Sequence, residues 1–463
     1  MKKVSFVILA LLIVAGIYVY PGVSRTLYIA TGFSAKNICS GHFISGFDAQ
    51  KVQDEALVPV SPIFGLVDFD VNEAKLQITT TIIGLFERHA FYRKGTGCTL
   101  LVIGQEEIKT AIQPINYDSL NKKDIWPLGL APVENYRADI DYPMLASAID
   151  SAFEEPSTES FRQTKAVAVI YKGELIAERY APDVDVETPL LSWSMAKSVT
   201  SLQVGMLVSQ GKLDLYAAAD VPQWQGEGDP RSKITLDQLM RMSSALDFNE
   251  TYGVDTDVSR MLSIEGNAAA FASQKKLKSE PDSQWSYSSG TTNIIAAIVK
   301  RAIGGDFQQY YDYAQSQLFE PLGIHSAQLE TDASDTFIGS SYFYASTRDW
   351  AKLGQLMLQN GLWNGKQILP DHWVGYSSTP TKTQPDNIYG AQFWLNADPQ
   401  SPEKQRKWPS VPSDAYFMAG FQSQYVVMIP SEQLVVVRMG FTKPGEESGI
   451  EHLVSGVVAA IQH

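Results

Sequence analysis

The chain has 463 residues, of which 44% are hydrophobic and 19% charged, and its formal net charge is −14. This length allows two or three domains with a large core, and the composition excludes a disordered chain. The acidic balance argues against nucleic-acid binding as the main activity, because nucleic-acid-binding proteins usually present a basic face.

The first residues are typical of an exported protein. Lys2 and Lys3 precede an apolar run over residues 4–20, which Pro21 and Gly22 close. The run is short for a membrane span and no clear cleavage site follows, so residues 1–22 favour an uncleaved signal anchor over a removed signal peptide. With the lysines in the cytoplasm, we expect the rest of the chain on the periplasmic side of the inner membrane, or free in the periplasm if the segment is cleaved.

The two cysteines of the chain, Cys39 and Cys98, both lie on the exported side of this segment. An oxidising compartment favours a structural disulfide between them, and two separate thiols are the alternative. Short β-branched runs in residues 32–125 predict a small, β-rich accessory region without recognisable chemistry. Residues 126–141 are broken by proline and glycine, and we expect them to connect this region to a main domain over residues 142–463.

The main domain predicts strands at both ends and helices between them. A helix beginning at Pro143 precedes one hairpin, and a second hairpin precedes a C-terminal helix. We therefore expect an α+β fold with an antiparallel sheet assembled from both ends of the domain, flanking helices and a helical cluster beside it. The predicted hairpin strands are 166–171, 175–180, 424–429 and 434–439, and the predicted helices include 194–209, 234–240, 292–303, 348–360 and 453–461.

The pattern Ser-x-x-Lys occurs five times, and its surroundings distinguish the copies. Three copies lie in polar stretches, where we expect solvated surface, and one ends a helical run before Gly211. Only Ser194 follows apolar and aromatic residues and begins an apolar helical period. The five serines are Ser119, Ser194, Ser209, Ser273 and Ser401.

Ser194 and Lys197 are one helical turn apart, so the lysine can reach the serine hydroxyl. Burial would lower the pKa of Lys197 and let it accept the serine proton. We interpret Ser194 as a nucleophile on these grounds. The alternative is a serine that caps a helix, followed by an ordinary helix lysine.

Two later segments complete a set of three motifs: Tyr287-Ser288-Ser289 and Ala419-Gly420-Phe421. With Ser194-Met195-Ala196-Lys197 they resemble the active-site motifs of the serine β-lactamase and penicillin-binding protein superfamily. Within it, the chain is most similar to the class C β-lactamase-like branch, and especially to 6-aminohexanoate-dimer hydrolases and carboxylesterases. The resemblance extends from about residue 142 to the C-terminus and implies the β-lactamase/transpeptidase-like fold.

The resemblance also implies a role for each motif residue. Ser194 would be acylated, Lys197 would accept its proton, and Tyr287 would pass a proton to the leaving group. The backbone N–H groups of Ser194 and Phe421 would form the oxyanion hole. Ser289, where many relatives carry asparagine, and Gly420 would contact the substrate.

The third motif departs from the penicillin-recognising members, which carry lysine or histidine two residues before the glycine. This chain has Met418 there. The missing charge favours a neutral ester or a linear amide as substrate over a β-lactam or a D,D-peptide. The alternatives are a D,D-peptidase or β-lactamase, and a catalytically silent protein that binds cell-wall fragments.

The sequence does not support an α/β-hydrolase or a metal-dependent enzyme. The chain lacks the Gly-x-Ser-x-Gly pentapeptide of α/β-hydrolases, and its six histidines show no metal-ligand spacing. We therefore expect no metal and no cofactor.

Overall fold

The computed structural model describes residues 20–462 apart from 109, 116–123, 125, 128, 132–135, 158–160 and 402–405. No helix within this part of the chain is long and apolar enough to cross a membrane. The expected anchor, residues 4–20, lies outside the described residues except for Tyr20, so the anchor and the predicted localisation stay predictions.

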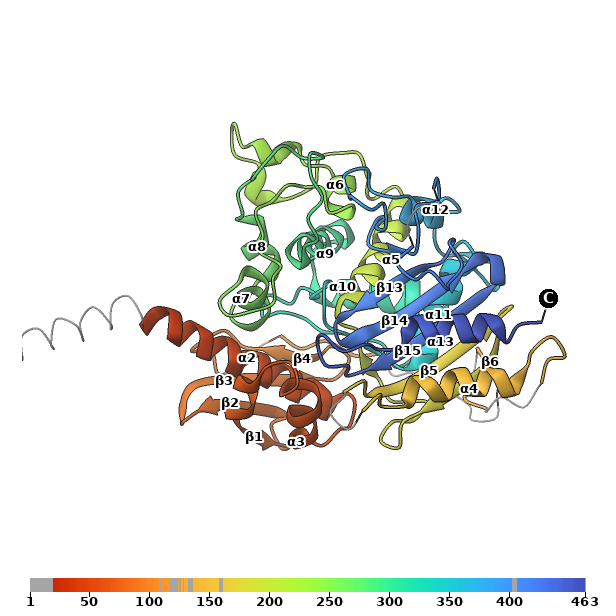
Figure 1. The fold of residues 1–463 in the computed structure, drawn as a ribbon. Helices are drawn as coiled ribbons and strands as arrows, with labels where there is room; N and C mark the ends of the chain where they lie inside the picture. The colour runs from red at the N-terminus through yellow and green to blue at the C-terminus, as the bar shows by residue number, and fades with distance from the viewer. Residues whose placement is uncertain are drawn as a thin grey trace, which may run out of the picture.

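A six-stranded antiparallel sheet forms the centre of the main domain (Figure 1). Both predicted hairpins are present, and the last strand of the second pairs with the first strand of the first. The sheet is therefore assembled from both ends of the domain, as expected. In spatial order its strands are β12 (Trp394–Leu395), β13 (Tyr416–Gly420), β14 (Gln424–Ile429), β15 (Leu434–Gly440), β5 (Thr164–Tyr171) and β6 (Glu174–Tyr180).

Helices cover both faces of this sheet, which explains why all eight residues of β5 are buried. Alternate side chains of a strand point to opposite faces. Val167 packs into a cluster with the two terminal helices, whereas Ala168 packs into the larger core on the other face. The terminal helices are α4 (Tyr142–Phe153) and α13 (Ile450–Ala459), and the opposite face is covered by α11 (Thr347–Leu358).

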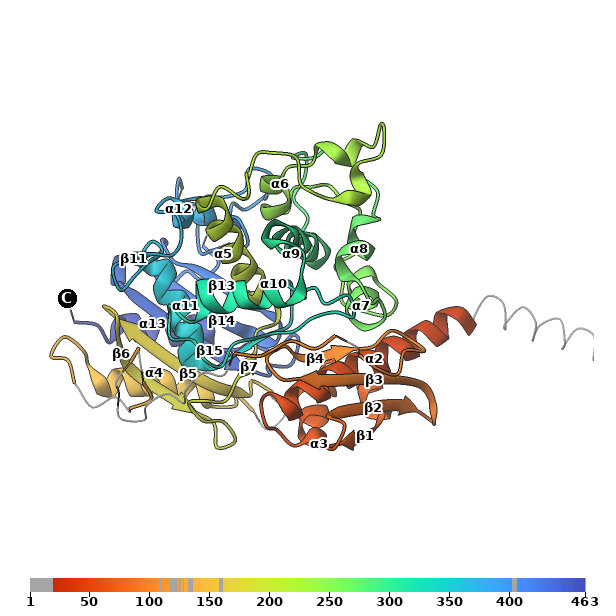
Figure 2. The ribbon, with the colours of Figure 1, turned by 180° about the vertical axis from the view of Figure 1, so that it is seen from behind.

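A helical cluster lies beside the sheet, as Figure 2 shows from behind. Its central helix, α5 (Ala196–Ser209), is buried along nearly its whole length. The helix predicted over residues 234–240 is present and begins with a complete capping box, in which the side chains of Thr235 and Gln238 each accept a hydrogen bond from the other's backbone N–H. The other members are α6 (Leu236–Met240), α7 (Asp257–Ser263), α8 (Ala268–Ser273), α9 (Ser289–Ile303) and α10 (Phe307–Ala314), and a small sheet of β7 (Leu190–Leu191), β9 (Phe343–Ala345) and β8 (Gln328–Leu329) leads into α5.

The N-terminal region contains the expected strands, but it begins with a long helix that the sequence analysis missed. This helix, α2 (Tyr20–Phe43), packs across the sheet, and it contains Pro21 and Gly22, which we had expected to end the preceding segment. Its buried side includes the polar residues Lys36 and Ser40, so it shows no clean apolar period. The four antiparallel strands are β1 (Asp68–Asn72), β2 (Gln77–Ile82), β3 (Leu85–Arg93) and β4 (Gly97–Leu100).

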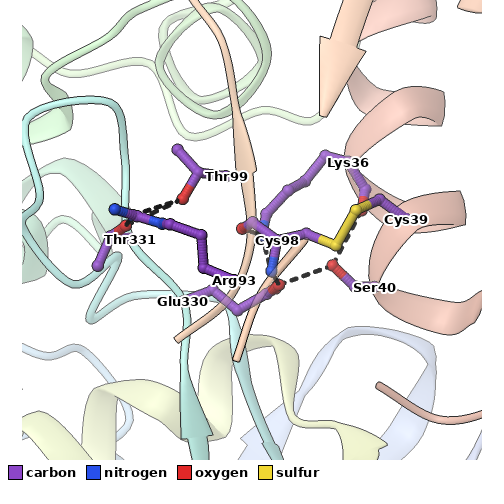
Figure 3. The surroundings of a disulfide bond; sticks show 8 residues. All are labelled: Lys36, Cys39, Ser40, Arg93, Cys98, Thr99, Glu330 and Thr331. Carbon is purple, nitrogen blue, oxygen red and sulfur yellow. Dashed lines mark hydrogen bonds and ion pairs between the residues drawn. A yellow bond between two sulfur atoms is a disulfide. The ribbon is translucent and has the colours of Figure 1, made fainter. Parts of the chain in front are cut away.

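A buried polar network joins this region to the main domain (Figure 3). Lys36 Nζ lies 2.6 Å from a carboxylate oxygen of Glu330, and both side chains are at most 1% exposed. Ser40 Oγ and the backbone N–H of Cys98 donate to the other Glu330 oxygen at 2.8 and 2.5 Å. The predicted disulfide between Cys39 and Cys98 is present and ties α2 to β4 at this point. The accessory region is thus fixed against the main domain, although the expected boundaries at 126 and 142 stay predictions.

Candidate active site

Ser194 lies where a short strand turns into the central helix. Strand β7 ends at Leu191, a short 3-10 helix covers Trp193–Met195, and α5 begins at Ala196. Trp193 has a φ of +46°, which is strained for a side chain of its size. Its indole is buried, donates to Gln422 Oε1 at 3.0 Å and stacks on Phe33, so the surrounding structure holds the backbone in this conformation.

Lys197 lies in the first turn of α5 and points at the serine. Its Nζ donates to Ser194 Oγ at 3.0 Å, to Ser289 Oγ at 2.9 Å and to the Ser340 carbonyl at 3.0 Å. The side chain is 1% exposed, and burial lowers the pKa of Lys197 to about 8, although the charge of Glu250 opposes the fall. A minor fraction of Lys197, roughly a tenth at pH 7, is therefore neutral and able to accept a proton.

Tyr287 approaches Ser194 from a different element. Its ring centroid is 4.8 Å from Lys197 Nζ, and its hydroxyl is near enough to the Ser194 side chain for that serine to affect the pKa of Tyr287. Burial raises the pKa of Tyr287 above its ordinary value. Tyr287 therefore stays protonated and can donate a proton. An aromatic cluster orients its ring, with Tyr389 and Trp394 at centroid distances of 5.8 and 5.6 Å.

Ser289 begins helix α9, and it connects Lys197 to a carboxylate that the sequence analysis did not single out. Its backbone N–H and its hydroxyl donate to the two oxygens of Glu250 at 2.7 and 2.5 Å. Burial raises the pKa of Glu250, and the contacts with Lys197 and Ser289 partly offset this shift. Glu250 lies in the loop between α6 and α7, and no local pattern marks it in the sequence.

The third motif reaches the nucleophile at the end of β13. A Cβ atom on Gly420 would lie 2.1 Å from the carbonyl oxygen of Ser192, so only glycine permits this approach. The ring of Phe421 then packs edge-on against Trp193, which brings its backbone beside the Ser194 segment. Backbone N–H groups such as those of Ser194 and Phe421 can stabilise negative charge on a carbonyl oxygen. Met418 is fully buried in the core and supplies no charge.

The remaining serines of the repeated pattern lie elsewhere. Ser209 ends α5, as expected. Our expectation that Ser273 lies on a solvated surface was wrong, because it is 2% exposed at the end of α8, where its hydroxyl donates to the Ala270 carbonyl. Ser119 lies outside the described residues, as does Lys404 of the last copy. Within the described residues, no group of three or more His, Cys, Asp and Glu side chains could hold a metal.

Comparison with known proteins places this geometry in a family. The chain is 22% identical over 277 residues to the 6-aminohexanoate-dimer hydrolase of Paenarthrobacter ureafaciens. The aligned region covers 54% of this chain and 67% of that protein. A Bacillus anthracis structure described as a candidate 6-aminohexanoate-dimer hydrolase has a TM-score of 0.55 at 18% identity and covers 89% of this chain and 95% of its own. The structure of a class C β-lactamase has a TM-score of 0.52 at 13% identity, and the match covers 71% of this chain and 99% of the β-lactamase.

At these identities the solved structures show a shared fold, which is the β-lactamase/transpeptidase-like α+β fold. The family model described as Beta-lactamase matches residues 149–455. That range is well over half of the chain and contains all three motifs around Ser194, so the chain belongs to the Beta-lactamase family.

Proposed function

We propose that this protein is a serine hydrolase that cleaves a neutral ester or a linear amide through an acyl-enzyme on Ser194. One observation carries the proposal. The Nζ of Lys197 lies 3.0 Å from Ser194 Oγ in a buried site that lowers the pKa of the lysine to about 8. A serine that merely capped a helix would have no need of a buried lysine held in this way.

The geometry supports one order of proton transfers. Neutral Lys197 takes the proton of Ser194 Oγ as the oxygen attacks the substrate carbonyl, and the backbone N–H groups of Ser194 and Phe421 bind the resulting oxyanion. Tyr287 donates its proton to the departing oxygen or nitrogen and regains one from Lys197. In the second half, water loses a proton to the same pair and attacks the acyl carbon, and Ser194 leaves with a proton.

The substrate class follows from the third motif and from the relatives. Met418 offers no positive charge to a substrate carboxylate, which disfavours β-lactams and D,D-peptides. The matched Paenarthrobacter protein is named for a linear amide dimer. A neutral ester or linear amide therefore fits better than a D,D-peptidase or β-lactamase substrate, and retention of serine, lysine and tyrosine together disfavours a silent binding protein.

Intact-mass labelling of the full chain with a short-chain fluorophosphonate tests the proposal. One adduct is expected on the wild type and on Ser209→Ala, a control from another copy of the Ser-x-x-Lys pattern, and none on Ser194→Ala. The same proteins are assayed with p-nitrophenyl esters, a linear amide dimer and a chromogenic cephalosporin. Absence of both labelling and turnover would favour the binding-protein alternative, and cephalosporin turnover above ester turnover would favour the β-lactamase.

The proposal extends to the location of the enzyme. The disulfide between Cys39 and Cys98 supports an oxidising compartment, in keeping with residues 4–20 acting as an anchor or an export signal. Fractionation of cells producing the full chain tests this, with carbonate extraction to separate an anchored protein from a soluble one. Recovery from the cytosolic fraction would contradict the proposed location.

A further inference from the structure

An apolar cavity of about 280 Å³ lies between the N-terminal region and the catalytic residues. One wall comes from residues of α2 and of the segment that follows it. These include Ile29 and Phe33 of α2, and Val60, Ile63 and Phe64 around a short 3-10 helix. The accessory region thus lines a space beside the catalytic residues, which no sequence pattern had indicated.

Residues 253–263, in α7 and just before it, form a second part of the wall, and the third part consists of residues that flank the reacting groups. Trp193 immediately precedes the nucleophile, Phe421 carries one of the two proposed oxyanion-hole N–H groups, and Tyr252 stacks on the Phe421 ring at 5.7 Å. A substrate carbonyl seated in the oxyanion hole would therefore have one of its substituents directed at this cavity.

The position of Tyr287 indicates which substituent that is. Tyr287 protonates the leaving group, so the leaving group must lie on the tyrosine side. Tyr287 packs with Trp285, Tyr389 and Trp394, and none of these four is among the described residues that line the cavity. The cavity accordingly lies on the acyl side of the scissile bond.

The lining also limits the chemistry of the occupant. The described residues around the cavity include hydroxyl groups but no charged side chain. A charged chain end would lose its hydration there without gaining a partner. A dry apolar cavity of about 150 Å³ holds benzene, so a space nearly twice that size suits a chain of about eight carbon atoms.

We propose that this cavity, built jointly by the N-terminal region and the active-site wall, binds the uncharged, medium-length acyl chain of the substrate. The inference rests on the proposed hydrolase function and narrows it to neutral fatty-acyl esters or amides. It also gives the N-terminal region a role in substrate selection.

The test is a series of p-nitrophenyl esters with one leaving group and acyl chains of two, four, six, eight and sixteen carbons, assayed on the full chain. Each buried methylene favours binding about four-fold. Octanoate has six more methylenes than acetate, so burial of only three of them should raise kcat/KM for octanoate at least about 60-fold above that for acetate, and the value should fall again at sixteen carbons. The hexanoate ester should exceed the 6-aminohexanoate ester, whose charged end the cavity disfavours.

Three variants test whether the chain-length preference arises in this cavity. Ile63→Trp fills the cavity and should lower kcat/KM for octanoate at least about ten-fold while leaving that for acetate within two-fold. Leu66→Trp introduces the same side chain three residues away, at an exposed site outside the lining, and it should leave both values of kcat/KM unchanged. Val60→Phe is a second narrowing variant with the same expectation as Ile63→Trp, should that protein not fold.

The outcomes separate this inference from the proposed function. Equal turnover of all acyl lengths, or equal losses on acetate and octanoate in both narrowing variants, would overturn the acyl-chain site while leaving the hydrolase intact. A preference for long alcohols in a series of alkyl acetates would overturn the assignment to the acyl side. Failure of every ester together with failure of fluorophosphonate labelling would overturn the proposed function itself.

Discussion

The hydroxyl of Ser289 lies between Lys197 and Glu250, accepting from Lys197 Nζ at 2.9 Å and donating to Glu250 Oε1 at 2.5 Å. The backbone N–H of Ser289 donates to the other carboxylate oxygen at 2.7 Å. The proposed base is thus linked through one hydroxyl to a half-buried carboxylate. Glu250 touches no reacting atom, so it acts as a positioning residue for Lys197.

This link predicts how activity depends on pH. The reaction requires neutral Lys197, so kcat/KM should rise with pH through an inflection near the lysine pKa of about 8. The charge of Glu250 raises the pKa of Lys197. Glu250→Gln removes that charge, so the acid limb should move to lower pH.

The pH dependence of kcat/KM and of the fluorophosphonate labelling rate would measure this shift. Glu227→Gln, at an exposed position, serves as the control and should leave the limb in place. A limb that stays fixed or moves upward in Glu250→Gln would show that Glu250 does not act on Lys197.

Two replacements of Lys197 test whether acylation requires its positive charge or its ability to accept a proton. Lys197→Ala should slow acylation by about 10³-fold, in the range for loss of a general base. Lys197→Arg keeps a cation but cannot accept a proton, so it should be about as slow. Stopped-flow measurement of acyl-enzyme formation would show this, and near-normal acylation in the arginine variant would mean that the lysine acts through its charge alone.

Tyr287 should matter more for some leaving groups than for others. An amine must be protonated to leave, whereas p-nitrophenolate leaves without a proton. Tyr287→Phe should therefore reduce amide hydrolysis about 10²-fold or more while changing p-nitrophenyl ester hydrolysis much less. Tyr389→Phe alters the same aromatic cluster and should lower both rates equally or not at all. Equal losses on both substrates in Tyr287→Phe would assign Tyr287 a structural role.

The buried pair between Lys36 and Glu330 should be important for stability. Lys36→Met leaves the Glu330 carboxylate buried without its cation, and breaking such a pair costs about 3–5 kcal/mol. The double variant Lys36→Met/Glu330→Gln, which removes both charges, should regain part of that loss. Thermal and urea unfolding would measure both changes. A single variant as stable as the wild type would show that water or rearrangement satisfies Glu330.

Much of the main domain could be predicted from its sequence because its signals are local. Short apolar runs, most of them rich in β-branched residues, predicted the strands of both hairpins, and an apolar helical period distinguished Ser194 from the other serines of its pattern. Spacing alone placed Lys197 one turn from Ser194. The same reasoning failed for α2, whose buried lysine and serine are satisfied by Glu330, almost 300 residues away in the chain.

By itself, therefore, the sequence determined the α+β class, the three motifs and the candidate cysteine pair, since each depends on neighbours within a few residues or on a resemblance between short motifs. Only the tertiary structure decided that Glu250 reaches Ser289, that Ser273 is buried and that Phe33 of the N-terminal region stacks on Trp193 beside the nucleophile. Those contacts join segments that are distant in the chain. Their positions are set by how whole elements pack, and no local pattern encodes that packing.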